Sequence, residues 1–404
     1  MASSSAEAAA TSYISEARSK GPASLQPQYA ELADLFSRKL YYQLLLSTQR
    51  FFGNAASASH TLRYDLFQNF VVHWKSKVSD LSVSELAITA AKQISSDPQK
   101  ALEFLDGQAK ELPENKPPHL LVSMEVAYYR LLLGDQLDQV KKDVDAGQKT
   151  LNSYDAVETV VSSGYYRVAA EYYKAKAMYG QYYTTSLLYL ACLPHNGTED
   201  DLTEAEKVER AHDLAIAAIL GEGIWNFGEL LLHPLLPILN NAQQHSFLLP
   251  LLSAFSSGSL PQFDSLLPSI QSHSLLAPSM PFLRQKICLM ALVEAVSKRD
   301  SKQRSALPFG TIATETALPE DEVEHLCMKA LSLSLIRGSL DQAARVASID
   351  WVQPRVLEMD QLRELRNKLG GWLNRVEETT RFVQGTREGG GGTSADAANK
   401  MVLV

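Results

Sequence analysis

Histidine and glutamate residues in a glycine-rich segment are the first candidates for chemistry in this chain. His233 follows Glu222 and Glu229 in LGEGIWNFGELLLHP, and an imidazole beside two carboxylates could act as a general base or a metal ligand. One His and two Glu in a tight turn more often form a satisfied hydrogen-bond cluster. The chain has no GxxxxGK, HExxH or GxSxG motif, and no GxGxxG after a strand. We therefore predict that the protein is not an enzyme and binds no cofactor or metal ion.

A helix-turn-helix pattern near the C-terminus is the next candidate, because such a motif can read DNA. Ile312 and Ala313 give a first short helix its buried side, and Leu318 and Pro319 make a turn. Apolar residues then recur at helical spacing through a second helix: Val323, Leu326, Ala330, Leu331 and Leu335. We expect Gly338 to end this helix and residues 340–351 to form a small β-hairpin, which together predict a winged helix.

The charge of this motif argues against nucleic acid as its ligand. Residues 309–341 contain six acidic and two basic residues, a net charge of −4. A duplex-binding helix needs lysine or arginine to neutralise phosphates and reach base edges. DNA recognition would require Lys329, Arg337, Arg345 and Arg355 to converge on one exposed groove. The winged helix is therefore predicted to be an interaction or structural module.

An amphipathic helix is predicted after Pro354. Apolar residues keep the helical period across it: Val356, Met359, Leu362, Leu365, Leu369, Trp372, Leu373, Val376 and Val383. Gly370 and Gly371 interrupt the pattern and weaken the helix locally. The apolar face can fold back on its own domain or join helices of other chains in a bundle.

Most of the chain before the winged helix is predicted to be helices in pairs. Breaks fall at Gly53, Pro98, Gly134 and Gly180, and the strings LLLGD and AMYGQ are typical of the tight turn in a helix pair. The fold class is therefore mainly all-α: a right-handed TPR-like α-solenoid, then a second domain with a C-terminal winged helix and a terminal amphipathic helix. We expect the many tyrosines of residues 165–189 to fill helix seams rather than form a ligand cage.

These patterns divide the chain into five segments. We predict a disordered N-terminus at 1–24, a solenoid at 25–180 and a domain at 181–354 whose winged helix covers about 282–354. A bundle helix at 355–385 and a flexible tail at 386–404 follow. The net charge of −8 in 404 residues argues against nucleic acid and anionic membranes as partners. The three scattered cysteines favour reduced thiols and a reducing compartment. With no signal peptide or membrane-spanning stretch visible, we expect a protein of the cytoplasm and nucleus.

Three stretches carry a resemblance to a known family. Residues 218–234 (AILGEGIWNFGELLLHP), 323–338 (VEHLCMKALSLSLIRG) and 351–357 (WVQPRVL) resemble PCI-domain proteins, the scaffold subunits of the proteasome lid, the COP9 signalosome and translation initiation factor three. The string GEGxxNFGELLxHP is most similar to the lid subunits. A scaffold of one of the two sister complexes stays an alternative, as does, more remotely, a nucleic-acid-binding winged helix.

The resemblance implies a non-catalytic subunit of a hetero-oligomeric complex, with no nucleic acid or membrane among its partners. Its wing would pair with the PCI domains of neighbouring lid subunits, and its last helix would enter the helical bundle of the lid. The residues implied for wing contacts are Ser339, Leu340, Arg345, Val346, Ile349 and Trp351. Those implied for the bundle are Leu362, Leu365, Leu369, Trp372 and Val376.

Overall fold

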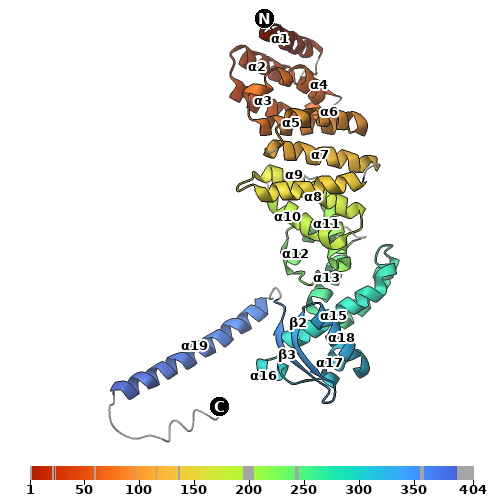
Figure 1. Ribbon diagram of the computed structural model, residues 1–404, viewed down its shortest axis with the longest axis vertical. Coiled ribbons are helices and arrows are strands. Elements are labelled where there is room, and N and C mark those ends of the chain that lie inside the picture. The colour runs from red at the N-terminus through yellow and green to blue at the C-terminus, as the bar shows by residue number, and fades with distance from the viewer. Residues whose placement is uncertain are drawn as a thin grey trace. The chain divides into compact units, whose positions relative to one another are not determined.

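The computed structural model describes residues 2–20, 22, 24–58, 61–95, 97–114, 116–134, 137–193, 204–241, 245–354 and 359–388. The chain forms two compact units. The first comprises residues 1–224, 238–248 and 273–283, and the second comprises residues 225–237, 249–272 and 284–404. The architecture is mainly helical with one small sheet, which confirms the predicted fold class (Figure 1).

The first unit is a succession of helices that pack on their neighbours in sequence, α6 on α7, α9 on α10 and α10 on α11 (Figure 1). This is the helical-repeat arrangement that the paired pattern predicts. Its helices are α1 (Ala2–Lys20), α2 (Gln26–Ser37), α3 (Tyr41–Gly53), α4 (Leu62–Asn69), α5 (Asp80–Gln93), α6 (Pro98–Glu111), α7 (Pro117–Leu133), α8 (Leu137–Ser153), α9 (Thr159–Ala175), α10 (Tyr179–Cys192) and α11 (Glu204–Leu220). Short 3-10 turns, η1 (Ala55–Ala58), η2 (Val71–His73), η3 (Lys75–Lys77) and η5 (Ala277–Ser279), lie between or after them.

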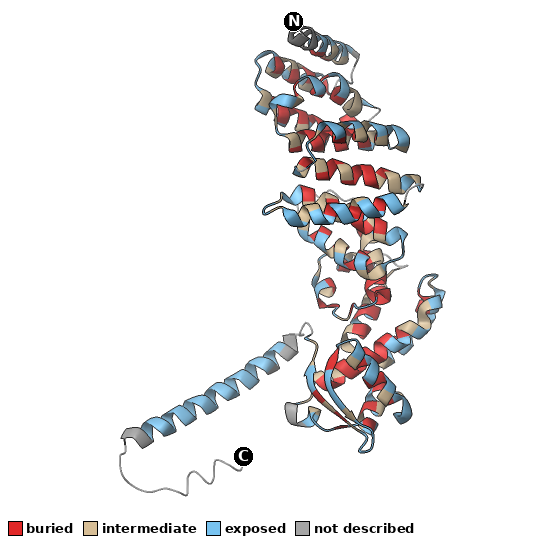
Figure 2. Cartoon of the chain, in the orientation of Figure 1, coloured by how far each residue is buried: buried red, intermediate tan, exposed pale blue. Residues whose placement is uncertain are grey.

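Buried residues lie along these helices (red in Figure 2), and most of them are apolar side chains that form two cores. One core lies among α1 to α5 around the fully buried Trp74, and a second among α5 to α9. Tyrosines belong to this packing: Tyr165, Tyr172, Tyr182, Tyr183 and Tyr189 are all buried. The tyrosine-rich segment therefore serves as helix-seam packing, as we predicted.

The N-terminal segment differs from its prediction. We expected disorder over residues 1–24, whereas residues 2–20 form α1, which packs on α2. Ala10 and Ile14 are buried in the first core, at 0% and 2% exposure. Alanine has the highest intrinsic helix propensity, and a short apolar stripe suffices once a neighbouring helix covers it.

Several helices in this fold are followed by a residue in the left-handed conformation, and this residue is often not glycine. Gly134 ends α7 at φ 75°, as the sequence predicts. The predicted boundary at Gly180 is wrong, because α9 ends at Ala175 and Gly180 lies in the first turn of α10. The left-handed residue after α9 is Ala177, with φ 54°. The Met178 amide donates to the Tyr173 carbonyl at 2.9 Å and the Ala177 amide to that of Lys174 at 3.1 Å, the Schellman pattern.

Ala177→Gly is expected to stabilise the protein by about 1 kcal/mol, because an exposed alanine at positive φ carries a steric cost that glycine lacks. Gly134→Ala is the matched opposite change at the end of α7 and should destabilise by a similar amount. Urea unfolding of the two variants measures both effects. A loss of stability in Ala177→Gly would contradict this account of the turn.

The second unit contains α12 (Gly228–Leu232), α14 (Leu260–Ser272), α16 (Ser301–Arg304) and most of α13 (Leu248–Ser257) and α15 (Met280–Ser297). The 3-10 turn η4 (Leu236–Asn241) begins in it. The winged helix follows: β1 (Leu307–Pro308), α17 (Phe309–Thr316), α18 (Glu320–Ser332), β2 (Ile336–Asp341) and β3 (Val346–Val352), and α19 (Met359–Glu388) ends the described chain. Helices α10 and α11 belong to the first unit, whereas the predicted division falls near residue 180.

The wing is a three-stranded antiparallel sheet in the order β1-β3-β2, one strand more than the predicted hairpin. Helix α18 ends at Ser332, and Ser334 takes the left-handed conformation at φ 57°. The expected helix end at Gly338 is therefore wrong: Gly338 lies inside β2. The predicted flexible tail begins at residue 386, and residues 389–404 lie outside the described residues.

Candidate interaction site: the wing edge and the terminal helix

Strand β2 forms one edge of the wing sheet, because it pairs only with β3 in the described part of the chain. Ser339 is exposed and Leu340 is half-buried on this strand. An edge strand presents a row of backbone N–H and C=O groups that another strand can pair with. The two β2 residues predicted for wing contacts therefore lie where a neighbouring strand could add.

The predicted residues of the second wing strand fall in a different environment. Strand β3 is central, Val346 is half-buried, and Ile349 is 3% exposed. Ile349 therefore supports the sheet from its core and cannot touch a partner directly. Arg345 is exposed before the strand and pairs with Glu320 at 3.4 Å.

Trp351 marks the accessible end of β3. Its indole is 37% exposed, and the Arg337 guanidinium carbon lies 4.7 Å from the ring centroid. The two residues are register partners across β2 and β3. A β-bulge between Arg337 and Gly338 shifts the register at this point. The bulge, the stacked arginine and the exposed indole form an amphipathic contact surface of the kind enriched at protein interfaces.

Helix α19 exposes an apolar face along its length (Figure 2). It runs unbroken through Gly370 and Gly371, and its described side chains between residues 362 and 385 are all exposed. The five predicted bundle residues are between 44% and 63% exposed: Leu362, Leu365, Leu369, Trp372 and Val376. Leu373, Phe382 and Val383 widen the same face. A stripe of this size on a soluble helix is typical of a surface that another protein covers.

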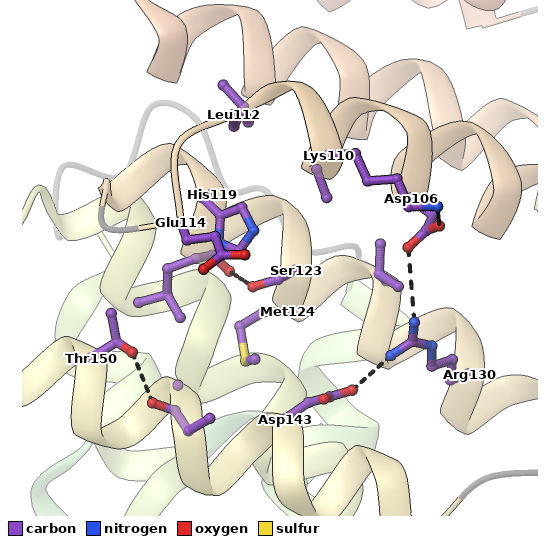
Figure 3. Close-up of a pocket in the computed structure, with 15 residues that line it drawn as sticks. Asp106, Lys110, Leu112, Glu114, His119, Ser123, Met124, Arg130, Asp143 and Thr150 are labelled. Carbon is purple, nitrogen blue, oxygen red and sulfur yellow. Dashed lines mark hydrogen bonds and ion pairs between the residues drawn. The ribbon is translucent and has the colours of Figure 1, made fainter.

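The first unit holds a cavity of about 430 Å³ among α6, α7 and α8 (Figure 3). Arg130 lies on its wall between Asp143, at 2.8 Å, and Asp106, at 3.9 Å. The Thr150 hydroxyl donates to the Ala146 carbonyl at 2.9 Å. These polar groups already have hydrogen-bond or ion-pair partners within the chain. We therefore interpret this cavity as a gap between packed helices rather than a ligand site.

The family models that match this chain and the known proteins similar to it point to the same family. A family model described as PSD13 N-terminal repeats matches residues 28–252, and the PCI domain model matches residues 267–351. The probable 26S proteasome regulatory subunit rpn9 of Schizosaccharomyces pombe is 38% identical over 373 residues, covering 92% of this chain and 95% of that protein. The chain belongs to this family of 26S proteasome regulatory subunits.

Two further relatives show the same full-length similarity. The 26S proteasome regulatory subunit RPN9 of Saccharomyces cerevisiae is 36% identical, covering 90% of this chain and 94% of that protein. The 26S proteasome non-ATPase regulatory subunit 13 homolog A of Arabidopsis thaliana is 32% identical, covering 93% and 97%. These matches confirm the resemblance to the proteasome subunits among PCI-domain proteins and the prediction of a non-catalytic chain.

The glycine-rich segment that suggested chemistry has a structural role in this family member. The His233 Nδ1 accepts a hydrogen bond from the Leu235 amide at 3.2 Å, which caps the turn. Trp225 and Phe227 from the same segment place their rings 5.6 and 5.3 Å from the Lys286 ammonium, whose side chain is 1% exposed. Burial lowers the pKa of Lys286 to about 7, while the two ring faces favour its charged form. No pattern in the amino-acid sequence pointed to this lysine.

Other chemistry is not assembled in the described residues. No group of three or more His, Cys, Asp and Glu residues is placed there to hold a metal ion. Cys192, Cys288 and Cys327 are free thiols, and burial raises the pKa of Cys327 to about 11, which disfavours a reactive thiolate. Among the described helices, none has the length and apolar character needed to cross a bilayer.

Three histidines meet in the first unit, at positions far apart in the sequence. His212 on α11 lies with its Nε2 3.3 Å from the Nε2 of His273, and its ring centroid is 4.4 Å from that of His245. The His212 Nδ1 is 3.2 Å from Oδ1 of Asp213, and the Lys174 ammonium lies 2.5 Å from the other carboxylate oxygen, Oδ2. From this network we assign the proton of His212 to Nδ1, which donates to Asp213. The Nε2–H of His273 then donates to the Nε2 of His212.

This histidine cluster predicts acid sensitivity. Burial, and then the neighbouring His212, lower the pKa of both His245 and His273, with Asp213 opposing the shift at His245. Their ordinary value is about 6.5 in the unfolded chain, so below that pH the unfolded state binds more protons. The contribution of these two histidines to the free energy of unfolding is therefore expected to be complete above about pH 6.5. It should be lost as the solution is acidified below that pH.

Urea unfolding at pH 7.5 and at pH 5.5 measures this effect. His273→Gln should lose less stability on acidification than the wild-type protein, because one of the facing imidazoles is removed. His325→Gln is the control, since His325 is exposed on α18. Equal pH dependence in the wild-type protein and His273→Gln would contradict the prediction.

Proposed function

We propose that the protein is a structural subunit of the lid in the 26S proteasome regulatory particle, which supports ubiquitin-dependent degradation by holding neighbouring subunits in place. The exposed apolar face of α19 is the observation that supports this proposal most directly. Each such side chain contributes about 1.5–3 kcal/mol when it is fully buried, so the face has a strong tendency to find a partner. Burial in a helical bundle with other lid subunits would satisfy it.

The wing supplies a second, geometrically distinct contact in this proposal. The β2 edge would pair with a strand of a neighbouring PCI domain, with Ser339 and Leu340 on the pairing strand and Arg345 and Trp351 beside it. Val346 and Ile349 would stabilise that edge from within the sheet. The helical repeats of the first unit would form an arm of the subunit.

The same proposal assigns a role to each part of the chain and a location to the protein. The repeats would form the arm and the PCI domain the docking module, joined to the bundle helix after residue 354. A lid subunit of this kind would work in the cytoplasm and nucleus, in complexes with other proteins and without nucleic acid.

A chain that ends at Pro354 tests the proposal. We expect it to fold, because the described side chains of α19 are all exposed, and to be absent from the regulatory particle. Native mass spectrometry of tagged full-length and shortened chains from cells measures incorporation. Normal incorporation of the shortened chain would contradict the proposal. If the full-length chain were found with subunits of the signalosome or of initiation factor three, the protein would belong to a sister complex instead.

A further inference from the structure

The apolar face of α19 follows a strict heptad rather than a loose amphipathic pattern. Leu362, Leu365, Leu369, Trp372 and Val376 are spaced three and four residues apart in alternation, and Val383 continues the spacing after Thr379. These are a and d positions of a helix that packs lengthwise against other helices. Leu373 and Phe382 fall on flanking positions and widen the stripe, which suits a bundle of several helices.

Charged residues beside this stripe are all basic. The e and g positions that flank the seam carry Arg366, Lys368 and Arg375, and no e or g position between residues 361 and 383 carries an acid. The acids of this stretch, Glu377 and Glu378 among them, fall on the b and c positions further from the seam. This separation of charge is unusual in a chain whose net charge is −8.

Lys368 and Arg375 make only weak contacts with other residues of the chain. Lys368 lies 3.3 Å from Asp300, with the two side chains 66% and 74% exposed. The Arg375 Nε donates to the Gly371 carbonyl at 3.3 Å on the helix surface. Exposed pairs of this kind add little stability and can exchange for a better-placed carboxylate.

The flanking charges determine which helices fit. In coiled coils and bundles the e and g residues select the partner and its orientation through charge pairing across the seam. A second copy of this chain offers no acid at those positions, so self-pairing leaves the three bases without partners. An anionic membrane would attract the bases, but the outer polar face of α19 also carries acids, unlike the uniformly basic face of an interfacial helix.

We propose that α19 selects its neighbour in the bundle by charge: Arg366, Lys368 and Arg375 pair with carboxylates that flank the apolar seam of an acidic helix in another subunit. This inference rests on the proposal that α19 enters a helical bundle. It adds the chemistry of the partner, which is an amphipathic helix with Asp or Glu at its e and g positions.

Two matched charge reversals of the full-length chain test the inference. Arg366→Glu with Arg375→Glu reverses two seam-flanking charges, and Arg363→Glu with Arg381→Glu reverses two at b and f positions, with the same change in net charge. We expect the first pair to lower incorporation into the regulatory particle about tenfold and the second to change it little. Equal incorporation of the two variants, whether both are normal or both impaired, would overturn the inference.

A third variant distinguishes failure of the charge-selection inference from failure of the proposed function. Leu365→Asp with Trp372→Asp removes the apolar seam itself. If it incorporates normally, α19 does not enter a bundle and both proposals fail; if it is excluded while Arg366→Glu with Arg375→Glu enters normally, only charge selection fails. Binding to phosphatidylserine vesicles that depends on Arg366 and Arg375, with unchanged incorporation, would also overturn the inference by assigning these bases to a membrane.

Discussion

Gly338→Ala is expected to destabilise the wing by about 3 kcal/mol. A Cβ atom at this position would lie 2.0 Å from the Ser348 carbonyl oxygen and 2.9 Å from the Ile349 Cα. Both atoms belong to the backbone of β3, so they cannot rotate away as the end of a flexible side chain could. The bulge next to Gly338 must open or the two strands must separate.

Hydrogen exchange of the β2 and β3 amides in the full chain measures this loss directly, and urea unfolding gives its size. Gly310→Ala is the control, because a Cβ there meets nothing within 4 Å and alanine favours the α17 helix. Unchanged protection of β2 in Gly338→Ala would contradict the prediction. If the wing edge docks as proposed, the same variant should also be lost from the regulatory particle although α19 is intact.

The two glycines that misled the boundary prediction show what local sequence can and cannot determine. Gly180 and Gly338 looked like helix ends, yet α9 ends at Ala175 and α18 at Ser332, with the left-handed residues Ala177 and Ser334 just beyond them. Any residue can take the left-handed conformation when the two Schellman hydrogen bonds and the tertiary packing offset its cost, and sequence does not report that packing. Gly338 is needed instead for a close approach between strands, which only the pairing of β2 with β3 creates.

The terminal helix, in contrast, was predictable in detail. The spacing of Leu362, Leu365 and Leu369 is local, and no long-range contact decides which face of α19 they share. The structure adds only that nothing in the described chain covers that face. The candidate wing residues were less predictable, because β1 adds a strand that makes β3 central and buries Ile349. A two-residue strand gives almost no periodic signal.

Clusters formed by distant segments could not be read from the chain at all. His212 and His273 are 61 residues apart, and they meet only because residues 273–283 return to the first unit. Lys286 lies on α15 in an apolar pattern, where its burial against Trp225 and Phe227 depends on how the glycine-rich segment folds. Such contacts require the fold before the chemistry can be recognised.

A buried ion pair holds two helices of the repeat arm together. Glu125 on α7 is 3% exposed and pairs with Arg167 on α9, whose guanidinium carbon also lies 5.3 Å from the centroid of the Tyr128 ring. Arg167→Met is expected to destabilise the protein by about 3–5 kcal/mol, because it leaves a carboxylate buried without its partner. Exposed pairs such as Lys100 with Asp97 should cost less than about 1 kcal/mol when broken.

The double variant Glu125→Met with Arg167→Met decides whether the pair or the packing is responsible. Two apolar side chains of similar length remove both charges together, so we expect the double variant to recover most of the stability that Arg167→Met loses. Urea unfolding of the wild-type protein, both single variants and the double variant completes the cycle, with Lys100→Met as the exposed control. Additive losses would show that the charges do not act as a pair. Recovery would show that apolar contacts alone can hold α7 against α9. The ion pair would then determine how the two helices are aligned rather than how strongly they pack.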